Sequence, residues 1–110
     1  MIISFKTKKL EKSLTTDKGL ARTYGELSKK IKQRLNQLQS AECLEDISKL
    51  PVLRLHQYIG KDNGTWSIDI HKNWRILFTI NQDPIPTKED GGVDLSRVTI
   101  ISVESVEDPH

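Results

Sequence analysis

The feature of this sequence that most constrains its fold is a change of hydrophobic spacing at Pro51. Before the proline, apolar residues recur every three or four positions, the period of one face of an α-helix. After it, apolar and polar residues alternate, the period of a β-strand with one buried face. Proline lacks a backbone N–H and disfavours helical geometry in its predecessor, so it ends the helical region. The sequence therefore predicts an α+β fold, with helices packed on one face of a sheet.

The helical half contains one strong pattern and two weaker ones. Residues 26–39 are the clearest helix, because four apolar residues recur there at helical spacing: Leu27, Ile31, Leu35 and Leu38. Residues 8–14 predict a brief helix on the same grounds, and residues 44–50 continue with apolar residues three apart. Residues 15–19 combine short polar side chains with a glycine, so they predict a break between two N-terminal helices.

The second half predicts a mostly antiparallel sheet. Three alternating segments are expected to form a meander, at residues 53–58, 66–70 and 74–80, with turns at 60–64 and 71–73. Two prolines and two glycines make residues 83–94 a long polar loop, and two further β-prone segments complete the sheet, at residues 2–5 and 97–103.

Alternation also predicts which side chains leave the core. It places four polar or aromatic side chains on the sheet face away from the helices: Arg54, His56, Tyr58 and Arg75. Such a face can bind phosphate through arginine and stack a base on an aromatic ring, although periodicity alone leaves open whether it does so. Trp66 and Trp74 alternate in phase with the buried residues and are predicted to lie in the core.

Length and composition fit one soluble domain spanning residues 1–110, because 35% of the side chains are apolar. No window approaches the ~20 apolar residues that span a bilayer, and the first residues lack a signal peptide, so we expect a cytoplasmic protein. Cys43 is the only cysteine and has no partner for an internal disulfide. One cysteine and three histidines at unrelated spacings do not predict a zinc site, and we expect no cofactor.

The net charge of +2 conceals a strong polarity along the chain. Residues 1–40 carry ten basic side chains against three acidic ones, a charge of +7, whereas residues 81–110 carry two against seven, a charge of −5. Part of the basic charge forms a stripe on the predicted helix at 26–39: Lys29, Lys30, Lys32 and Arg34. Two interpretations stay open, since this stripe either binds RNA phosphates or only keeps the helix solvated.

Six segments, in their order and spacing, carry a resemblance to a known family. They read MIISFK at residues 1–6, KLE at 9–11, LRLH at 53–56, GTWSI at 64–68, NWRILF at 73–78 and EDPH at 107–110. Together they resemble the HigB-like killer proteins of the RelE/ParE superfamily, which are toxins of type II toxin–antitoxin systems. The stretch from residue 83 to about 97 is longer than the usual connection, so nothing transfers onto it.

The resemblance implies a RelE/ParE-like fold, with two N-terminal helices packed on a mostly antiparallel sheet. It implies an RNase that enters the ribosomal A site and cuts mRNA there. The implied partners are the 30S subunit, mRNA and a helix-turn-helix antitoxin, through which the complex binds operator DNA; no membrane is involved. Cleaving RNA without a metal needs a base, an acid and a cation, and histidine, with a pKa of about 6.5, suits both proton transfers.

Mapped by motif, the implied catalytic residues are His56, Arg75, Asp108 and His110. The two histidines carry the proton transfers, with base and acid left unassigned. Asp108 orients a neighbouring imidazole, and Arg75 binds the scissile phosphate, because arginine keeps its charge and offers forked donors.

Two departures from the family pattern weaken this transfer. Ile59 stands where family members often place a lysine, and Pro109 stands where they have a tyrosine. The first removes a cation, and the second removes a stacking surface worth ~1–3 kcal/mol per base. Tyr58 or Lys61 is the expected compensating contact to RNA.

Other interpretations of these histidines, and another function for the chain, stay open. Without the resemblance, His56 is an ordinary surface histidine, and His71 in its predicted turn is structural or solvated. The alternative function is a non-enzymatic toxin-fold protein, either a gyrase poison like the ParE branch or a decayed toxin that keeps antitoxin binding. A gyrase poison does not need His56 and His110 as proton carriers, so their presence favours RNA cleavage.

Overall fold

The computed structural model of the protein describes residues 1–58 and 64–108, and the elements there follow the expected order of helices before sheet. Strand β1 (Ile2–Phe5) precedes four helices, α1 (Lys8–Thr15), α2 (Asp17–Tyr24), α3 (Ser28–Ser40) and α4 (Leu44–Ser48). Four more strands follow, β2 (His56–Gln57), β3 (Thr65–His71), β4 (Trp74–Ile80) and β5 (Ile100–Glu107). Single 3₁₀ turns lie at Gly25–Leu27, Pro51–Leu53 and Leu95–Arg97. The predicted α+β class is confirmed.

The strands form one sheet in the order β1-β5-β4-β3-β2. All neighbouring pairs are antiparallel except β1 and β5, which run parallel. The mostly antiparallel sheet is therefore confirmed, while the pairing of the first strand with the last is a long-range choice that local periodicity does not encode.

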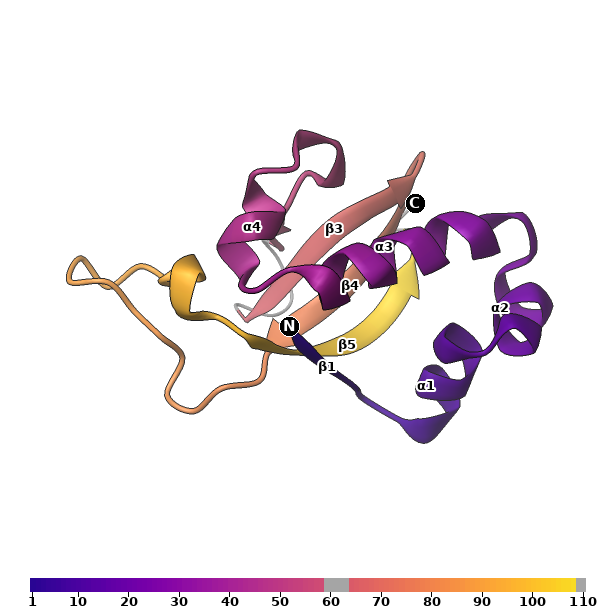
Figure 1. The fold of residues 1–110 in the computed structure, drawn as a ribbon, viewed down its shortest axis with the longest axis horizontal. Coiled ribbons are helices and arrows are strands. Elements are labelled where there is room, and N and C mark those ends of the chain that lie inside the picture. The colour runs from indigo at the N-terminus through magenta and orange to yellow at the C-terminus, as the bar shows by residue number, and fades with distance from the viewer. Residues whose placement is uncertain (59–63, 109–110) are drawn as a thin grey trace.

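Helices α3 and α4 lie on one face of the sheet, and α1 and α2 extend beyond the β1 edge (Figure 1). The core lies between α3 and the sheet, and its fully buried members include Ile31, Leu38, Ile68, Ile76 and Phe78. Trp66 and Trp74 pack against this core, as alternation predicted. Among the described residues, no helix has the length and apolar character needed to cross a bilayer.

The predicted break between two helices is confirmed at Thr16, but its predicted extent of residues 15–19 is wrong, because α1 ends at Thr15 and α2 begins at Asp17. Only Thr16 separates α1 from α2, and its hydroxyl caps α2 by accepting a hydrogen bond from the Gly19 amide at 3.0 Å. A Cβ on Gly19 would lie 2.3 Å from the Lys12 carbonyl oxygen. Glycine is therefore needed for the close approach of the two helices, not for a turn.

The predicted strand at residues 53–58 is mostly absent. Pro51–Leu53 form a 3₁₀ turn, Arg54 adopts a left-handed conformation with φ 44°, and only His56–Gln57 pair with β3. The turn predicted at 60–64 lies almost wholly outside the described residues. The last strand is displaced from the predicted 97–103 to Ile100–Glu107, and a bulge between the Leu77 and Phe78 pairings accommodates its polar residues.

Arg34 ties α3 to the sheet at a second bulge. Register shifts between Asp69 and His71, so Ile70 has no partner residue in β4. Arg34 donates Nε to the Asp69 carbonyl at 2.9 Å and Nη2 to the Ile70 carbonyl at 3.3 Å. Only 5% of Arg34 is exposed, and this burial lowers its pKa. The guanidinium thus donates to two backbone carbonyls beside the bulge and ties α3 to β3.

Replacing Arg34 tests this anchor. Arg34→Met keeps an unbranched apolar side chain but leaves two carbonyls without donors, so we expect the free energy of unfolding to fall by about 2 kcal/mol in urea titrations. Gln33→Met, at the exposed neighbouring position on α3, should change it by less than about 0.5 kcal/mol. Equal effects of the two substitutions would contradict the anchoring role.

Candidate functional site

Two of the predicted site residues, His56 and Arg75, lie on the sheet face away from α3, which we call the open face. Strand register arranges its side chains in two adjacent rows. The first row contains His56, Ser67, Leu77 and Ser105, and the second contains Asp69, Arg75 and Glu107. His56 and Arg75, more than fifteen residues apart in the sequence, therefore share one surface, as alternation predicted.

His56 is held in one tautomer by a backbone carbonyl. Its Nδ1 lies 2.8 Å from the Arg54 carbonyl oxygen. A carbonyl can only accept, so this contact requires a proton on Nδ1 and leaves Nε2 with a lone pair in the neutral ring. The orientation of the imidazole therefore depends on the conformation of Arg54.

Ser67 contacts the imidazole ring of His56. This serine is fully buried, and its Oγ lies 3.1 Å from Nε2 and 3.4 Å from Nδ1 of His56. A hydroxyl on the axis of the Nε2 lone pair would be much farther from Nδ1 than from Nε2, because that axis points away from the ring. The similar distances place Oγ beside the ring, off this axis, so the Nε2 lone pair remains available to another donor.

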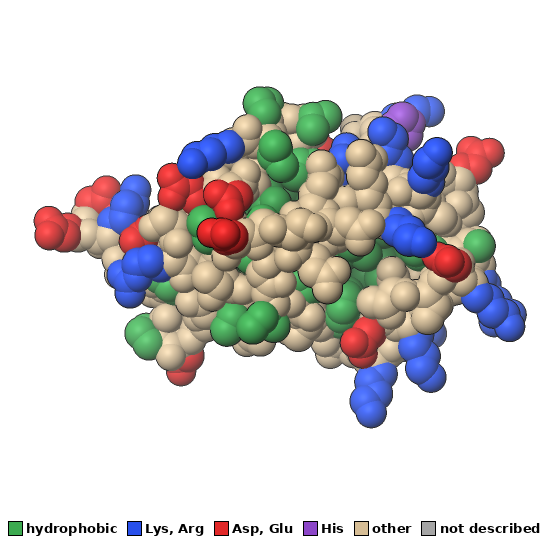
Figure 2. All heavy atoms as spheres, in the orientation of Figure 1, with side chains coloured by type: hydrophobic (Ala, Val, Ile, Leu, Met, Phe, Trp, Pro, Cys, Tyr) green, Lys and Arg blue, Asp and Glu red, His purple; other side chains and the backbone are tan. Residues whose placement is uncertain are grey.

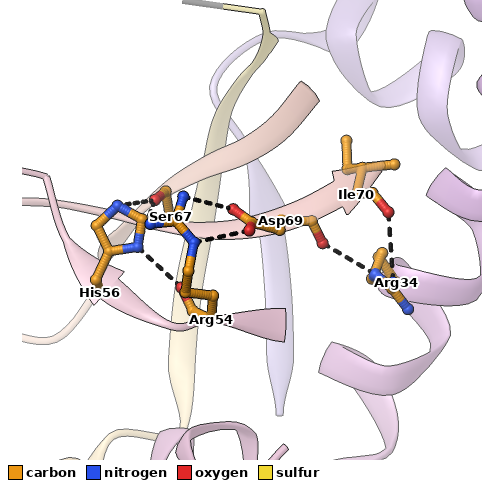
Figure 3. A network of polar contacts seen from close by, with 6 residues as sticks. All are labelled: Arg34, Arg54, His56, Ser67, Asp69 and Ile70. Carbon is orange, nitrogen blue, oxygen red and sulfur yellow. Dashed lines mark hydrogen bonds and ion pairs between the residues drawn. The ribbon is translucent and has the colours of Figure 1, made fainter. Parts of the chain in front are cut away.

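Asp69 fixes Arg54. The Arg54 guanidinium donates Nε and Nη2 to the two carboxylate oxygens of Asp69, at 2.8 and 3.2 Å, as Figure 3 shows. This hydrogen-bonded pair raises the pKa of Arg54, first through the hydrogen bonds and then through the opposite charge. The pair stabilises a residue with positive φ, and the carbonyl of that residue accepts from His56.

The same network excludes Arg34 from the predicted RNA-binding stripe. Its donors contact the Asp69 and Ile70 carbonyls and the Gln37 side chain inside the protein. Helical periodicity placed Arg34 among exposed basic residues because it cannot reveal that the neighbouring strand offers unpaired carbonyls. Lys29 and Lys30 are exposed on α3, and Lys32 is exposed but pairs with Asp17 at 2.9 Å.

Arg75 contains an unsatisfied donor. Its Nε is buried and has no hydrogen-bond partner in the described part of the chain. The residue lies in register between Asp69 and Glu107, one row from His56. A buried guanidinium nitrogen without an acceptor is uncommon in folded proteins.

A concavity of about 480 Å³ adjoins these rows. It is lined by residues of both sheet rows and of the β1 edge, including Lys6, Leu77, Glu104, Ser105 and Glu107. The Glu104 carboxylate accepts a hydrogen bond from the Thr79 hydroxyl at 3.0 Å. His56 and Arg75 do not line this concavity, but Leu77 and Ser105 share the row of His56, and Glu107 is paired with Arg75.

The C-terminal candidates are only partly described. Strand β5 carries Glu107 into register with Arg75, and Asp108 follows directly as an exposed residue. His110 and Pro109 lie outside the described residues, as do Ile59 and Lys61. The roles of Asp108, His110 and Lys61 stay predictions.

Two other candidate residues, Tyr58 and His71, lie near the ends of β2 and β3. Tyr58 is half-buried, and its amide donates to the Thr65 carbonyl at 2.7 Å. His71 is exposed beside the turn between β3 and β4, where Lys72 has φ 54°. Within residues 1–58 and 64–108, no three His, Cys, Asp or Glu side chains gather as a metal site would require.

Sequence reasoning missed the roles of Ser67 and Asp69. Both alternate with buried isoleucines in β3, so the signal for their placement on the open face was present. Their partners could not be inferred, because β2 pairs with β3 over only two residues and Arg54 leaves the strand geometry.

Comparisons with known proteins agree with this architecture. Residues 3–87 match the family described as the RelE-like toxin of type II toxin–antitoxin system HigB. The chain is also 36% identical over 86 residues to the Endoribonuclease HigB of Proteus vulgaris, a match that covers 76% of this chain and 89% of that protein. The family match includes His56 and Arg75 and ends before β5.

The Asp69 contact leads to a prediction about β2. Asp69→Asn removes the charge that holds Arg54, whose side chain is 58% exposed, so the loss should be at most about 1 kcal/mol. Because Arg54 leads into β2, we expect amide exchange at Tyr58 to accelerate up to about fivefold. Asp17→Asn, which breaks an exposed ion pair far from β2, should leave it unchanged. Unaltered Tyr58 exchange in Asp69→Asn would contradict the role of this pair.

Proposed function

This chain belongs to the HigB-like family of RelE-like toxins of type II toxin–antitoxin systems, and from that membership we propose that it is an endoribonuclease. We propose that it enters the ribosomal A site and cleaves mRNA there by metal-independent acid–base chemistry. The observation that carries the proposal is that two residues lie on one sheet face in adjacent rows. One is His56, whose Nδ1 proton is bound by a backbone carbonyl, and the other is Arg75, whose buried Nε has no acceptor within the described residues.

His56 is proposed as the general base. With its proton held on Nδ1 by the Arg54 carbonyl, neutral His56 offers Nε2 to the 2′-OH of the message. The 2′-oxygen attacks the adjacent phosphorus, the bond from phosphorus to the 5′-oxygen breaks, and the 2′-proton passes to Nε2. Ser67 Oγ lies beside the ring and off the axis of the Nε2 lone pair, so it does not compete with the 2′-OH for that lone pair.

Arg75 is proposed to bind the scissile phosphate. A phosphate oxygen would give the buried Nε its missing acceptor, and a charge-assisted bond of this kind strengthens as negative charge develops in the transition state. Asp69 and Glu107 flank Arg75 in register, but in the described part of the chain their carboxylates accept from Arg54 and Ser105 and form no ion pair with Arg75.

His110 is proposed as the general acid that protonates the 5′-oxygen, with Asp108 orienting its imidazole. The register of β5 supports this assignment, because Glu107 lies opposite Arg75. His110 follows Glu107 by three positions, so an extended chain limits the distance between their Cα atoms to ~10 Å. The assignment otherwise rests on the resemblance of the terminal segment to the family.

Recognition of RNA is proposed to use two surfaces. Tyr58 and Lys61 follow β2 closely in the sequence, and we assign them to contacts with the message, together with the exposed guanidinium of Arg54. Lys29, Lys30 and Lys32 lie on α3, in the layer opposite the open face, so we assign them to ribosomal RNA.

The family implies an antitoxin partner. We propose that this antitoxin has a helix-turn-helix domain, through which the complex binds operator DNA, and that both proteins act in the cytoplasm. The second candidate function is a non-enzymatic one, as a gyrase inhibitor or a decayed toxin. Ile59 and Pro109 favour it, because each replaces a side chain that the family pattern uses at the site.

Cleavage on translating ribosomes tests the proposal. Primer extension on mRNA should show codon-linked cuts with the unaltered chain, and His56→Ala, Arg75→Ala or His110→Ala should each lower the rate by roughly 10²–10⁴-fold. His71→Ala, an exposed histidine away from the site, is the matched control and should retain the cuts. Intact mRNA with broken or relaxed DNA would instead support the gyrase interpretation.

A further inference from the structure

A groove with a basic rim lies between α1 and α2. The two helices enclose a groove of about 590 Å³ beyond the β1 edge of the sheet. Leu10 and Tyr24 contribute apolar and aromatic surface to it. Its rim carries five basic side chains, all exposed: Lys6, Lys9, Lys12, Lys18 and Arg22.

The described lining of the groove also includes one acidic residue, Glu104. In the described part of the chain, none of the five has an ion pair with a carboxylate within 4.0 Å. Figure 2 shows Lys and Arg side chains spread over the end of the molecule formed by α1 and α2. Like charges held around one groove repel each other, and a bound polyanion would relieve this repulsion and release counterions.

The groove continues into the concavity beside the candidate site. Lys6 and Glu104 line both of them. The Lys6 amide donates to the Val103 carbonyl at 2.9 Å, which places this residue at the edge of β5. The concavity in turn reaches Leu77 and Ser105, which share the row of His56. The basic groove and the concavity therefore adjoin each other at Lys6 and Glu104, and the concavity reaches the row that contains His56.

We propose that the α1–α2 groove binds the message itself, holding nucleotides that flank the cleaved bond. This inference rests on the proposed function and extends it from the reacting phosphate to the neighbouring strand. The five cations bind successive phosphates, and Tyr24 offers a ring on which a base stacks. The continuity through Lys6 favours the strand being cleaved over a separate RNA, and the dense positive rim favours a phosphate backbone over an acidic peptide.

The test uses RNA that cannot be cleaved. Fluorescent 2′-O-methyl oligonucleotides of 4 and 12 nucleotides lack the attacking hydroxyl, so anisotropy titrations report binding alone. We expect the longer one to bind the unaltered chain at least tenfold more tightly. Lys9→Gln/Lys12→Gln should abolish most of this gain and reduce the salt dependence of binding, the slope of log K against log[salt], by about 1.4. Lys49→Gln/Lys88→Gln, with the same charge change outside the groove, should keep the gain.

Several results would overturn the proposal. One is equal affinity of the unaltered chain for both oligonucleotides. Another is tighter binding of the longer oligonucleotide that persists in Lys9→Gln/Lys12→Gln, or that is lost equally in Lys49→Gln/Lys88→Gln. Binding of an acidic peptide that depends on Lys9 and Lys12, without a length effect for RNA, would assign the groove to a protein partner. Since cleavage is not measured here, loss of the primer-extension cuts tests His56 and Arg75 separately from the groove.

Discussion

The candidate site depends on Asp69, which links the helical layer to the open face of the sheet. Its backbone carbonyl accepts from Arg34 of α3, and its carboxylate holds the guanidinium of Arg54. The Arg54 carbonyl then fixes the proton on Nδ1 of His56. One residue in β3 thus connects the packing of α3 with the tautomer of a histidine on the opposite side of the sheet.

This arrangement explains why a two-residue strand can carry a precisely oriented side chain. β2 has too few ladder hydrogen bonds to position His56 by itself. The ion pair at Arg54 and the buried Ser67 supply the missing constraints from neighbouring elements. Arg75 needs no such support, because it lies in the middle of the sheet between two paired strands.

The sequence predicted those features of the structure that depend on the local hydrophobic period. It did not predict those that depend on contacts between elements distant in the sequence. Alternation correctly placed His56 and Arg75 on one face, and helical spacing located α3. It failed at Gly19, whose role is a close contact between helices, and at Arg34, whose donors satisfy a bulge in another element. The charge polarity of the sequence hinted at an anionic partner, but only folding gathers the cations of α1 and α2 around one groove.

The central claim is that neutral His56 presents an unprotonated Nε2 toward the open face. A long-range ¹H–¹⁵N correlation spectrum of histidine-labelled protein, recorded on the neutral form of the ring, measures this directly. The account predicts that His56 carries its proton on Nδ1, with the Nε2 resonance of an unprotonated nitrogen. A spectrum in which His56 is protonated on Nε2 would contradict it.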